Sequence, residues 1–178
     1  MPRNLPTKNY TGAATPPGEI VLRPIGFVRS PHTERYGTPR QAVLEAHAKR
    51  RPDERVRIEL LTDHVPAQAL QDLDGFDYVW ILSYLHLNRG WNALVAPPRS
   101  PDVKRGLLST RAPHRPNPIG LSAARLLSVS GAQLELERLD LVDGTPVLDI
   151  KPYVPYADAF PDADAGWVDA LPPMPEEG

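Results

Sequence analysis

Alternation of apolar and polar residues, typical of β-strands, dominates this chain. In 55–61, RVRIELL, apolar residues alternate with charged ones, which predicts a strand with one buried face. The stretch 76–87, FDYVWILSYLHL, is mostly aromatic at even and largely aliphatic at odd positions, which predicts a central strand buried on both faces. A further strand is predicted over 119–129. Residues 65–73 predict one short helix that begins at Pro66.

The segment 134–141 changes its hydrophobic phase halfway. Leucines occupy even positions at 134 and 136 but odd positions at 139 and 141. One extra residue near Glu137 or Arg138 accounts for this change, so we predict a β-bulge there. Because bulges are frequent beside active sites, 137–140 becomes a candidate ligand-facing segment.

The connections between these strands complete the predicted architecture. Asp143 and Gly144 favour a hairpin turn, after which 147–151 is expected to pair back. Residues 88–106 lack periodicity, and loops of this length are often functional. Short strands joined by turns with Gly and Pro, and little helix, predict a mainly β fold. We expect a small closed or nearly closed β-barrel with one or two short helices.

Composition excludes several classes of protein. The 178 residues, 41% of them hydrophobic, suffice for one domain, and 22 prolines leave almost no room for a helical bundle. Without cysteine there are no disulfides and no thiolate chemistry. No run of about 18 apolar residues or signal-peptide pattern is present, so we expect a soluble cytoplasmic protein with no membrane partner. Residues 1–19 are expected to be a flexible N-terminal segment, 20–170 the barrel domain and 171–178 an acidic, proline-rich tail.

The net charge of -2 is unevenly distributed along the chain. All 20 Lys and Arg residues lie at or before Lys151, and the stretch 99–125 is strongly basic with Asp102 as its one acidic residue. A local anionic partner fits this cluster, as do solvated loop charges.

Most familiar catalytic motifs are missing from the sequence. No two glycines are spaced G-x-G, which excludes the Rossmann fingerprint, and there is no P-loop. The histidines form no H-E-x-x-H, and the triplet 32–34, HTE, lacks the cysteine ligands of a zinc deaminase, so no metal is expected. The segment 120–124, GLSAA, lacks the last glycine of a nucleophile elbow, so Ser122 is expected to be structural.

The segment 109–122, STRAPHRPNPIGLS, contains three prolines within six residues. Each proline fixes its φ at about -65°, so this proline-rich loop is stiff before any ligand binds. The loop also carries more polar side chains than a connector needs: Arg111, His114, Arg115 and Asn117. This combination predicts a ligand-binding loop.

Together with 39–41, PRQ, and 140–153, DLVDGTPVLDIKPY, this loop closely resembles the TsaA-like family, also called TrmO. The resemblance extends from Pro24 to about Trp167. Family members are homodimeric β-barrel methyltransferases that use S-adenosylmethionine. They methylate N6 of threonylcarbamoyladenosine at position 37 of tRNA. The resemblance therefore implies the same reaction here, with S-adenosylmethionine as cofactor, tRNA as partner and a homodimer as the assembly.

The resemblance also implies a set of residues that line the methyl donor: Pro39, Arg40, Gln41, His86, Leu87, Arg111, Leu121, Leu139 and Asp140. Glu137 and Arg138 are added as backbone contacts beside the predicted bulge.

Methyl transfer needs positioning and a group that accepts the N6 proton. The candidate bases are Asp140, Asp143 and His114, although we expect Asp143 mainly to form its turn. Arg111 is predicted to bind the donor carboxylate. The predicted RNA-binding residues are Arg115, Lys104 and Arg105.

Three departures from the family pattern leave other functions open. Ala112 replaces a usual serine, and 83–86, SYLH, replaces Phe-x-Phe-His. The chain is also expected to lack the C-terminal domain of longer members. One alternative is a barrel that binds RNA or a small ligand without turnover, and another is a methyltransferase of a small metabolite. A binder would transfer no methyl label to tRNA, a metabolite enzyme would lack salt-dependent affinity for tRNA, and a purely structural protein would show neither property.

Overall fold

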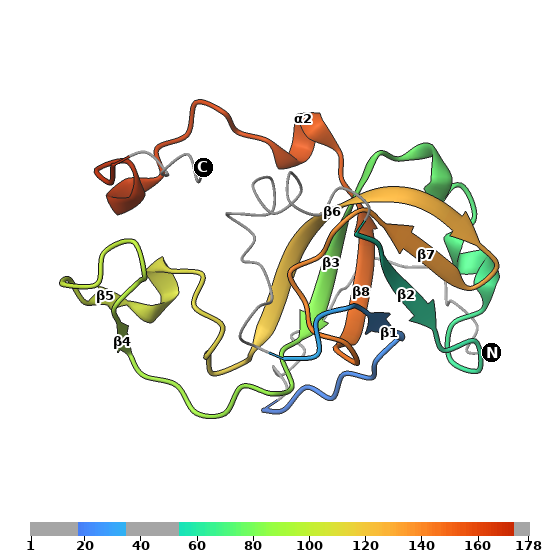
Figure 1. Cartoon of the computed structure of the whole chain (residues 1–178), viewed down its shortest axis with the longest axis horizontal. Coiled ribbons are helices and arrows are strands. Elements are labelled where there is room, and N and C mark those ends of the chain that lie inside the picture. Colours follow the sequence, from blue (N-terminus) through green and yellow to red (C-terminus); the bar gives the residue numbers. More distant parts are fainter. Residues whose placement is uncertain (1–17, 35–53, 173–178) are drawn as a thin grey trace, which may run out of the picture.

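The computed structural model describes residues 18–34 and 54–172. Within these residues, antiparallel strands close a barrel (Figure 1), in the order β1 (Gly26–Arg29), β2 (Val56–Leu60), β7 (Gln133–Leu136), β6 (Ile119–Ser130), β3 (Tyr78–Tyr84) and β8 (Pro146–Pro152). The predicted mainly β fold with a closed barrel is confirmed. Most of 1–19 and 171–178, and all of 39–41, lie outside the described residues.

The remaining elements are short. They are the 3₁₀ turns η2 (Ala67–Leu70), η3 (Leu73–Gly75), η4 (Leu107–Ser109) and η5 (Gly166–Val168), the helix α2 (Pro155–Asp158), and β4 (Leu94–Val95), which pairs with β5 (Arg105–Gly106). None of the helices in the described part of the chain has the length and apolar character needed to cross a membrane.

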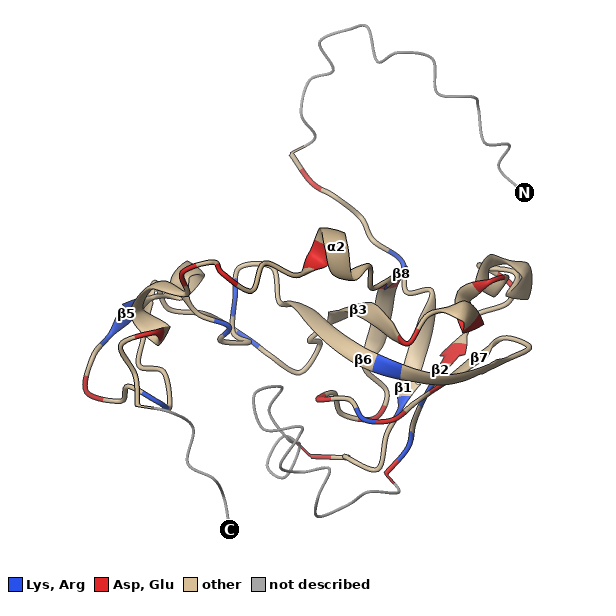
Figure 2. Cartoon of the chain, turned by 90° about the horizontal axis from the view of Figure 1, so that it is seen from above, with Lys and Arg blue, Asp and Glu red and all other residues tan. Residues whose placement is uncertain are grey.

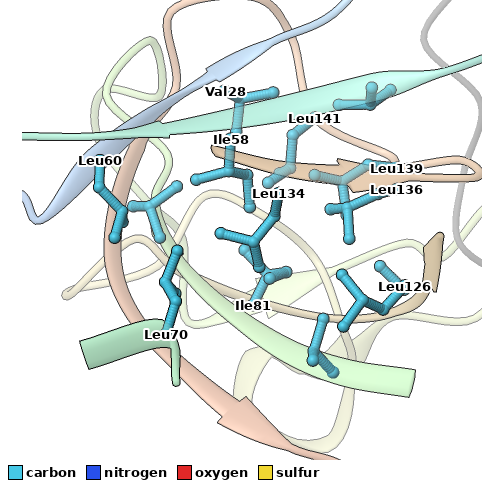
Figure 3. Close-up of a cluster of buried hydrophobic side chains, with 14 residues drawn as sticks. Val28, Ile58, Leu60, Leu70, Ile81, Leu126, Leu134, Leu136, Leu139 and Leu141 are labelled. Atoms are coloured by element: carbon cyan, nitrogen blue, oxygen red, sulfur yellow. The ribbon is translucent and has the colours of Figure 1, made fainter. Parts of the chain in front are cut away.

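Side chains fill the interior of the barrel. Ile58 of β2 lies opposite Val28 of β1 and Leu134 of β7, so alternating residues of neighbouring strands meet on one face. These residues join a cluster that includes Leu126, Leu139 and others (Figure 3). Burial of each such side chain stabilises the fold by about 1.5–3 kcal/mol. Because the middle of the barrel is a packed core, ligand-binding groups have to lie at its ends or on its outer surface.

The predicted strand over 76–87 forms as β3, but it is not buried on both faces. Its odd-numbered residues Val79, Ile81 and Ser83 are buried, whereas Tyr78 and Tyr84 are exposed. In a closed barrel only one face of each strand points inward, so the aromatic side faces outward.

The single helix predicted over 65–73 is wrong. The chain forms the two 3₁₀ turns η2 and η3, and Pro66 directly precedes the first. Asp72 between them has a φ of 65°, a left-handed conformation that interrupts a right-handed helix.

The predicted bulge near Glu137 or Arg138 is also misplaced. β7 ends at Leu136, and the register shift between β6 and β7 lies in β6, between Leu126 and Ser128. Leu139 and Leu141 reach the core from the segment that follows β7. The change of hydrophobic phase therefore marks the point where the chain leaves the sheet.

The expected turn at 143–144 is present, but β8 does not pair back on β7. The Thr145 N–H donates to the Val142 carbonyl oxygen at 3.3 Å, and Gly144 has a φ of 72°. β8 then pairs with β1 and β3 and closes the barrel.

The connection between β3 and β6 carries an arm, which we define as residues 89–109 with the sheet β4–β5 and η4. In Figure 1 this arm projects away from the barrel. The C-terminal segment 155–172 lies against it, because the Trp167 indole donates to the Ser109 carbonyl oxygen at 2.9 Å. The guanidinium of Arg105 also stacks 5.0 Å from the centre of the Trp167 ring.

Candidate active site

Two segments are joined at the end of the barrel where β3 stops and β6 begins. The Leu85 N–H donates to the Pro118 carbonyl oxygen at 2.7 Å, and the Asn88 side chain donates to the Pro113 carbonyl oxygen at 3.4 Å. The residues after β3, which include His86, therefore run alongside the proline-rich loop.

Arg115 holds the proline-rich loop in shape. Its Nη1 donates to the carbonyl oxygens of Thr110 at 2.9 Å and Ala112 at 3.3 Å. Thr110 adds to this order, because its hydroxyl accepts the Ala112 N–H at 3.3 Å. The contact of Arg115 with a tRNA phosphate stays a prediction, since the structure gives this side chain a role within the loop.

Asp140 lies against β6 at the same end of the barrel. The Ser122 hydroxyl donates to Asp140 Oδ1 at 2.5 Å. Burial raises the pKa of the Asp140 carboxyl, while the bonds from Ser122 and from its own backbone amide and the positive charge of Arg111 lower it. Because the charge of Arg111 acts on this carboxyl, the proline-rich loop and the segment 137–140 lie close together.

Ser122 is a residue whose link to the site our sequence reasoning missed. We expected a structural serine, and its hydroxyl instead binds a candidate functional carboxylate. The signal was present in the alternation of β6, where Ser122, Ala124 and Leu126 share the buried face. A serine at a core-facing position needs a hydrogen-bond partner, and that requirement points to a nearby polar group.

The other two candidate bases hold loops in place. Asp143 Oδ1 accepts the Ser30 N–H at 3.0 Å, which ties the turn before β8 to the end of β1. His114 Nδ1 lies 3.3 Å from the carbonyl oxygen of Arg89 and links the proline-rich loop to the arm. Asp140 is therefore the strongest of the three candidates.

Comparison with known proteins identifies the family. Residues 27–159 match the family model of the tRNA-methyltransferase O N-terminal domain. This chain belongs to that family. The tRNA (adenine(37)-N6)-methyltransferase of Escherichia coli is 39% identical over 155 residues, which cover 83% of this chain and 63% of the relative. A Pseudomonas aeruginosa protein, RcsF, whose name assigns it provisionally to the S-adenosylmethionine-dependent methyltransferases, is 44% identical over 155 residues, 85% of this chain and 64% of that protein.

A solved structure has the same fold. The crystal structure of TrmO from Pseudomonas aeruginosa is 41% identical and superposes with a TM-score of 0.68, covering 87% of this chain and 65% of that chain. The chain thus spans less than two thirds of the length of each of these relatives.

The donor-binding residues implied by the tRNA-methyltransferase O family fall into three groups in the structure. His86, Leu87 and Arg111 are exposed on the two joined segments, and Leu121 is exposed on β6. Leu139 is fully buried in the core and can offer a ligand only its backbone. The third group, 39–41, lies outside the described residues.

Glu137 and Arg138 form a local ion pair within this tRNA-methyltransferase O domain. Arg138 Nη2 lies 3.1 Å from Glu137 Oε2, and Arg125 of β6 approaches the other carboxylate oxygen at 3.8 Å. Their side chains therefore anchor the segment 137–140 to the barrel, as is compatible with the predicted backbone contacts.

Basic residues of the tRNA-methyltransferase O domain lie along the arm and the chain that returns from it (Figure 2). Lys104 is exposed, whereas Arg105 stacks on Trp167, so the predicted RNA-binding residues differ in their freedom to meet a ligand. Among the residues that the structure describes, no group of three His, Asp or Glu side chains could hold a metal ion.

Proposed function

We propose that this chain is an S-adenosylmethionine-dependent methyltransferase that methylates N6 of threonylcarbamoyladenosine at position 37 of tRNA, as a homodimer in the cytoplasm. The observation that carries this proposal is the approach of Arg111 to the buried Asp140 carboxyl at one end of the barrel. The names of the Escherichia coli and Pseudomonas aeruginosa relatives support the reaction and its methyl donor.

The side chains at this end match the chemistry of S-adenosylmethionine. Arg111 offers a planar guanidinium, which suits the carboxylate of the donor. Leu87 and Leu121 are 61% and 49% exposed and offer apolar surface for an adenine ring. The carboxylate of Asp140 supplies a negative charge that favours a cationic ligand.

When bound, S-adenosylmethionine supplies a methyl carbon on positively charged sulfur, so that N6 bonds to this carbon as the carbon–sulfur bond breaks and its electron pair stays on sulfur. The N6 proton has to leave, and we assign its acceptance to the Asp140 carboxylate. Burial raises the pKa of Asp140 toward the working pH, which makes this carboxyl a stronger base. Arg111 limits that rise and keeps the ionised form accessible.

An apolar patch on the outside of the barrel supports the homodimer. Tyr84 of β3 lies opposite Ile119 of β6, and Leu121 follows one residue pair along on the same face. All three side chains are exposed in the single chain. Contiguous apolar surface of this kind favours association with a protein partner, and a second copy would bury it.

The deciding experiment is incubation with methyl-labelled donor and tRNA, followed by nucleoside analysis. Label should appear in threonylcarbamoyladenosine, and no label should enter tRNA that lacks the threonylcarbamoyl group. Asp149→Asn is the matched control, because this β8 carboxylate pairs with Lys151 at 2.8 Å and has no assigned role in the reaction. Donor binding without transfer would favour the binding module, and transfer to small metabolites alone would favour the metabolite enzyme.

A further inference from the structure

Ser83 and Ser122 lie on the inner face of the barrel near the candidate active site. Ser83 of β3 is opposite Gly120, and Ser122 of β6 is opposite Ile81. Since directly opposite residues of antiparallel strands share a face, both serines point to the buried side. Ser83 is fully buried and Ser122 is 2% exposed. A hydroxyl in such a place costs free energy unless it finds a partner.

The two hydroxyls differ in their partners. Ser122 Oγ donates to Asp140 Oδ1 at 2.5 Å, a length typical of a strong hydrogen bond to a charged oxygen. Ser83 Oγ has no hydrogen-bond partner in 18–34 or 54–172. The pair thus provides a natural comparison, in which one buried serine contacts the candidate base and the other does not.

The charged surroundings of Asp140 are simple. Arg111, on the proline-rich loop, is the charged side chain that favours its ionised form. On the segment of Asp140 itself, Glu137 and Arg138 pair with each other at 3.1 Å. β6, which packs against Asp140, contributes the uncharged hydroxyl of Ser122.

We propose that Ser122 is a positioning residue, whose buried hydroxyl holds the Asp140 carboxylate ionised and oriented so that it can accept the N6 proton. This inference rests on the proposed function, because Asp140 acts as a base only if the chain methylates N6. It also assigns to the inner face of β6 a part in the reaction.

The inference has a definite consequence for the pH dependence of the reaction. A hydrogen bond donated to a carboxylate favours its charged form, so Ser122→Ala raises the pKa of Asp140 further. The acidic limb of the kcat/KM profile should move to higher pH by about one unit, because bonds to charged groups have this strength. At alkaline pH the rate should return towards that of the wild type. A merely structural serine would lower the rate at every pH.

The test compares Ser122→Ala with Ser122→Thr, which keeps a hydroxyl, and with the matched control Ser83→Ala. Two readouts are used: the pH profile of methyl transfer to tRNA, and a carbon NMR titration of the Asp140 carboxyl in the free protein. We expect both readouts to shift by about one pH unit in Ser122→Ala and to stay unchanged in the other two variants.

The outcomes separate this inference from the proposed function. If the wild type methylates tRNA but neither readout shifts in Ser122→Ala, the inference alone is overturned. The same holds if Ser83→Ala shifts as much as Ser122→Ala, because the effect would then reflect general loosening of the barrel. If the wild type transfers no methyl group, the proposed function and the inference both fail.

Discussion

Asp140 is a single residue whose burial has opposite effects on stability and activity. Asp140→Asn keeps an oxygen for the Ser122 hydroxyl but cannot accept a proton. We therefore expect methyl transfer to tRNA to fall by about 10²- to 10⁴-fold, the usual contribution of a general base. Single-turnover kinetics with labelled donor would measure this loss, and an Asp140→Asn enzyme with wild-type rates would exclude Asp140 as the base.

The same substitution should stabilise the fold. Burial raises the pKa of Asp140 in the folded state, so the native protein binds this proton more tightly than the unfolded chain. Stability contributed by the protonated carboxyl is present below the unfolded pKa of about 3.9 and is lost as the pH rises through the folded pKa. At pH 7, Asp140→Asn should therefore have a larger free energy of unfolding than the wild type in urea titrations, and the difference should vanish in acid. A less stable variant at pH 7 would contradict this account.

Arg111 allows a test of donor binding. A lysine keeps the charge but loses the planar, two-pronged geometry that suits a carboxylate. Loss of one hydrogen bond to a charged group predicts roughly tenfold weaker binding of S-adenosylmethionine to Arg111→Lys in calorimetry. Arg29→Lys is the control, because Arg29 pairs with Glu59 at 2.7 Å and has no assigned role in binding. Equal affinity in wild type and Arg111→Lys would exclude the proposed contact.

At the scale of elements, local alternation was sufficient to predict β2 and β6, because each buries the face that its sequence marks as apolar. It failed where long-range closure decides the outcome. β8 inserts between β1 and β3, and nothing in its own residues specifies those partners. The site follows the same rule: the stiff loop with Arg111 was recognisable, whereas the bond from Ser122 to Asp140 depends on how β6 and the segment after β7 meet in space.

Gly120 of β6 tests how tightly β3 and β6 pack near the site. A Cβ at this position would lie 2.5 Å from the Ser83 hydroxyl oxygen, so Gly120→Ala should cost about 1–3 kcal/mol of stability. Combining it with Ser83→Ala removes that oxygen and should recover about 1 kcal/mol in a double-mutant cycle measured by urea unfolding. Gly26→Ala gives the contrast, because its Cβ would meet the backbone carbonyl of Glu59 at 2.5 Å. Additive effects of Gly120→Ala and Ser83→Ala would contradict this packing.

At the scale of the whole molecule, Trp167 fastens the C-terminal segment to the arm. Trp167→Ala removes both the bond to Ser109 and the stacking with Arg105, whereas Trp167→Phe keeps an aromatic ring for Arg105. Each contact contributes about 1 kcal/mol, so proteolysis within 155–172 should be several-fold faster in the alanine variant and intermediate in the phenylalanine variant. Tyr156→Ala, which changes an exposed residue of α2, is the control. Identical cleavage rates in all variants would show that the segment is held by other contacts.

The arm also determines how the molecule should meet a polyanion. Each Lys or Arg that neutralises a phosphate releases counterions, so affinity for tRNA should fall steeply as salt rises. Lys104 is exposed on the arm, whereas Arg105 and Arg115 are engaged in packing on Trp167 and in ordering the proline-rich loop. Lys104→Ala should therefore lower the slope of log affinity against log salt by about one while donor binding stays unchanged. Lys151→Ala, whose charge is paired with Asp149 on the barrel, should leave the slope unaltered, and an equal change in both variants would mean that tRNA does not use the arm.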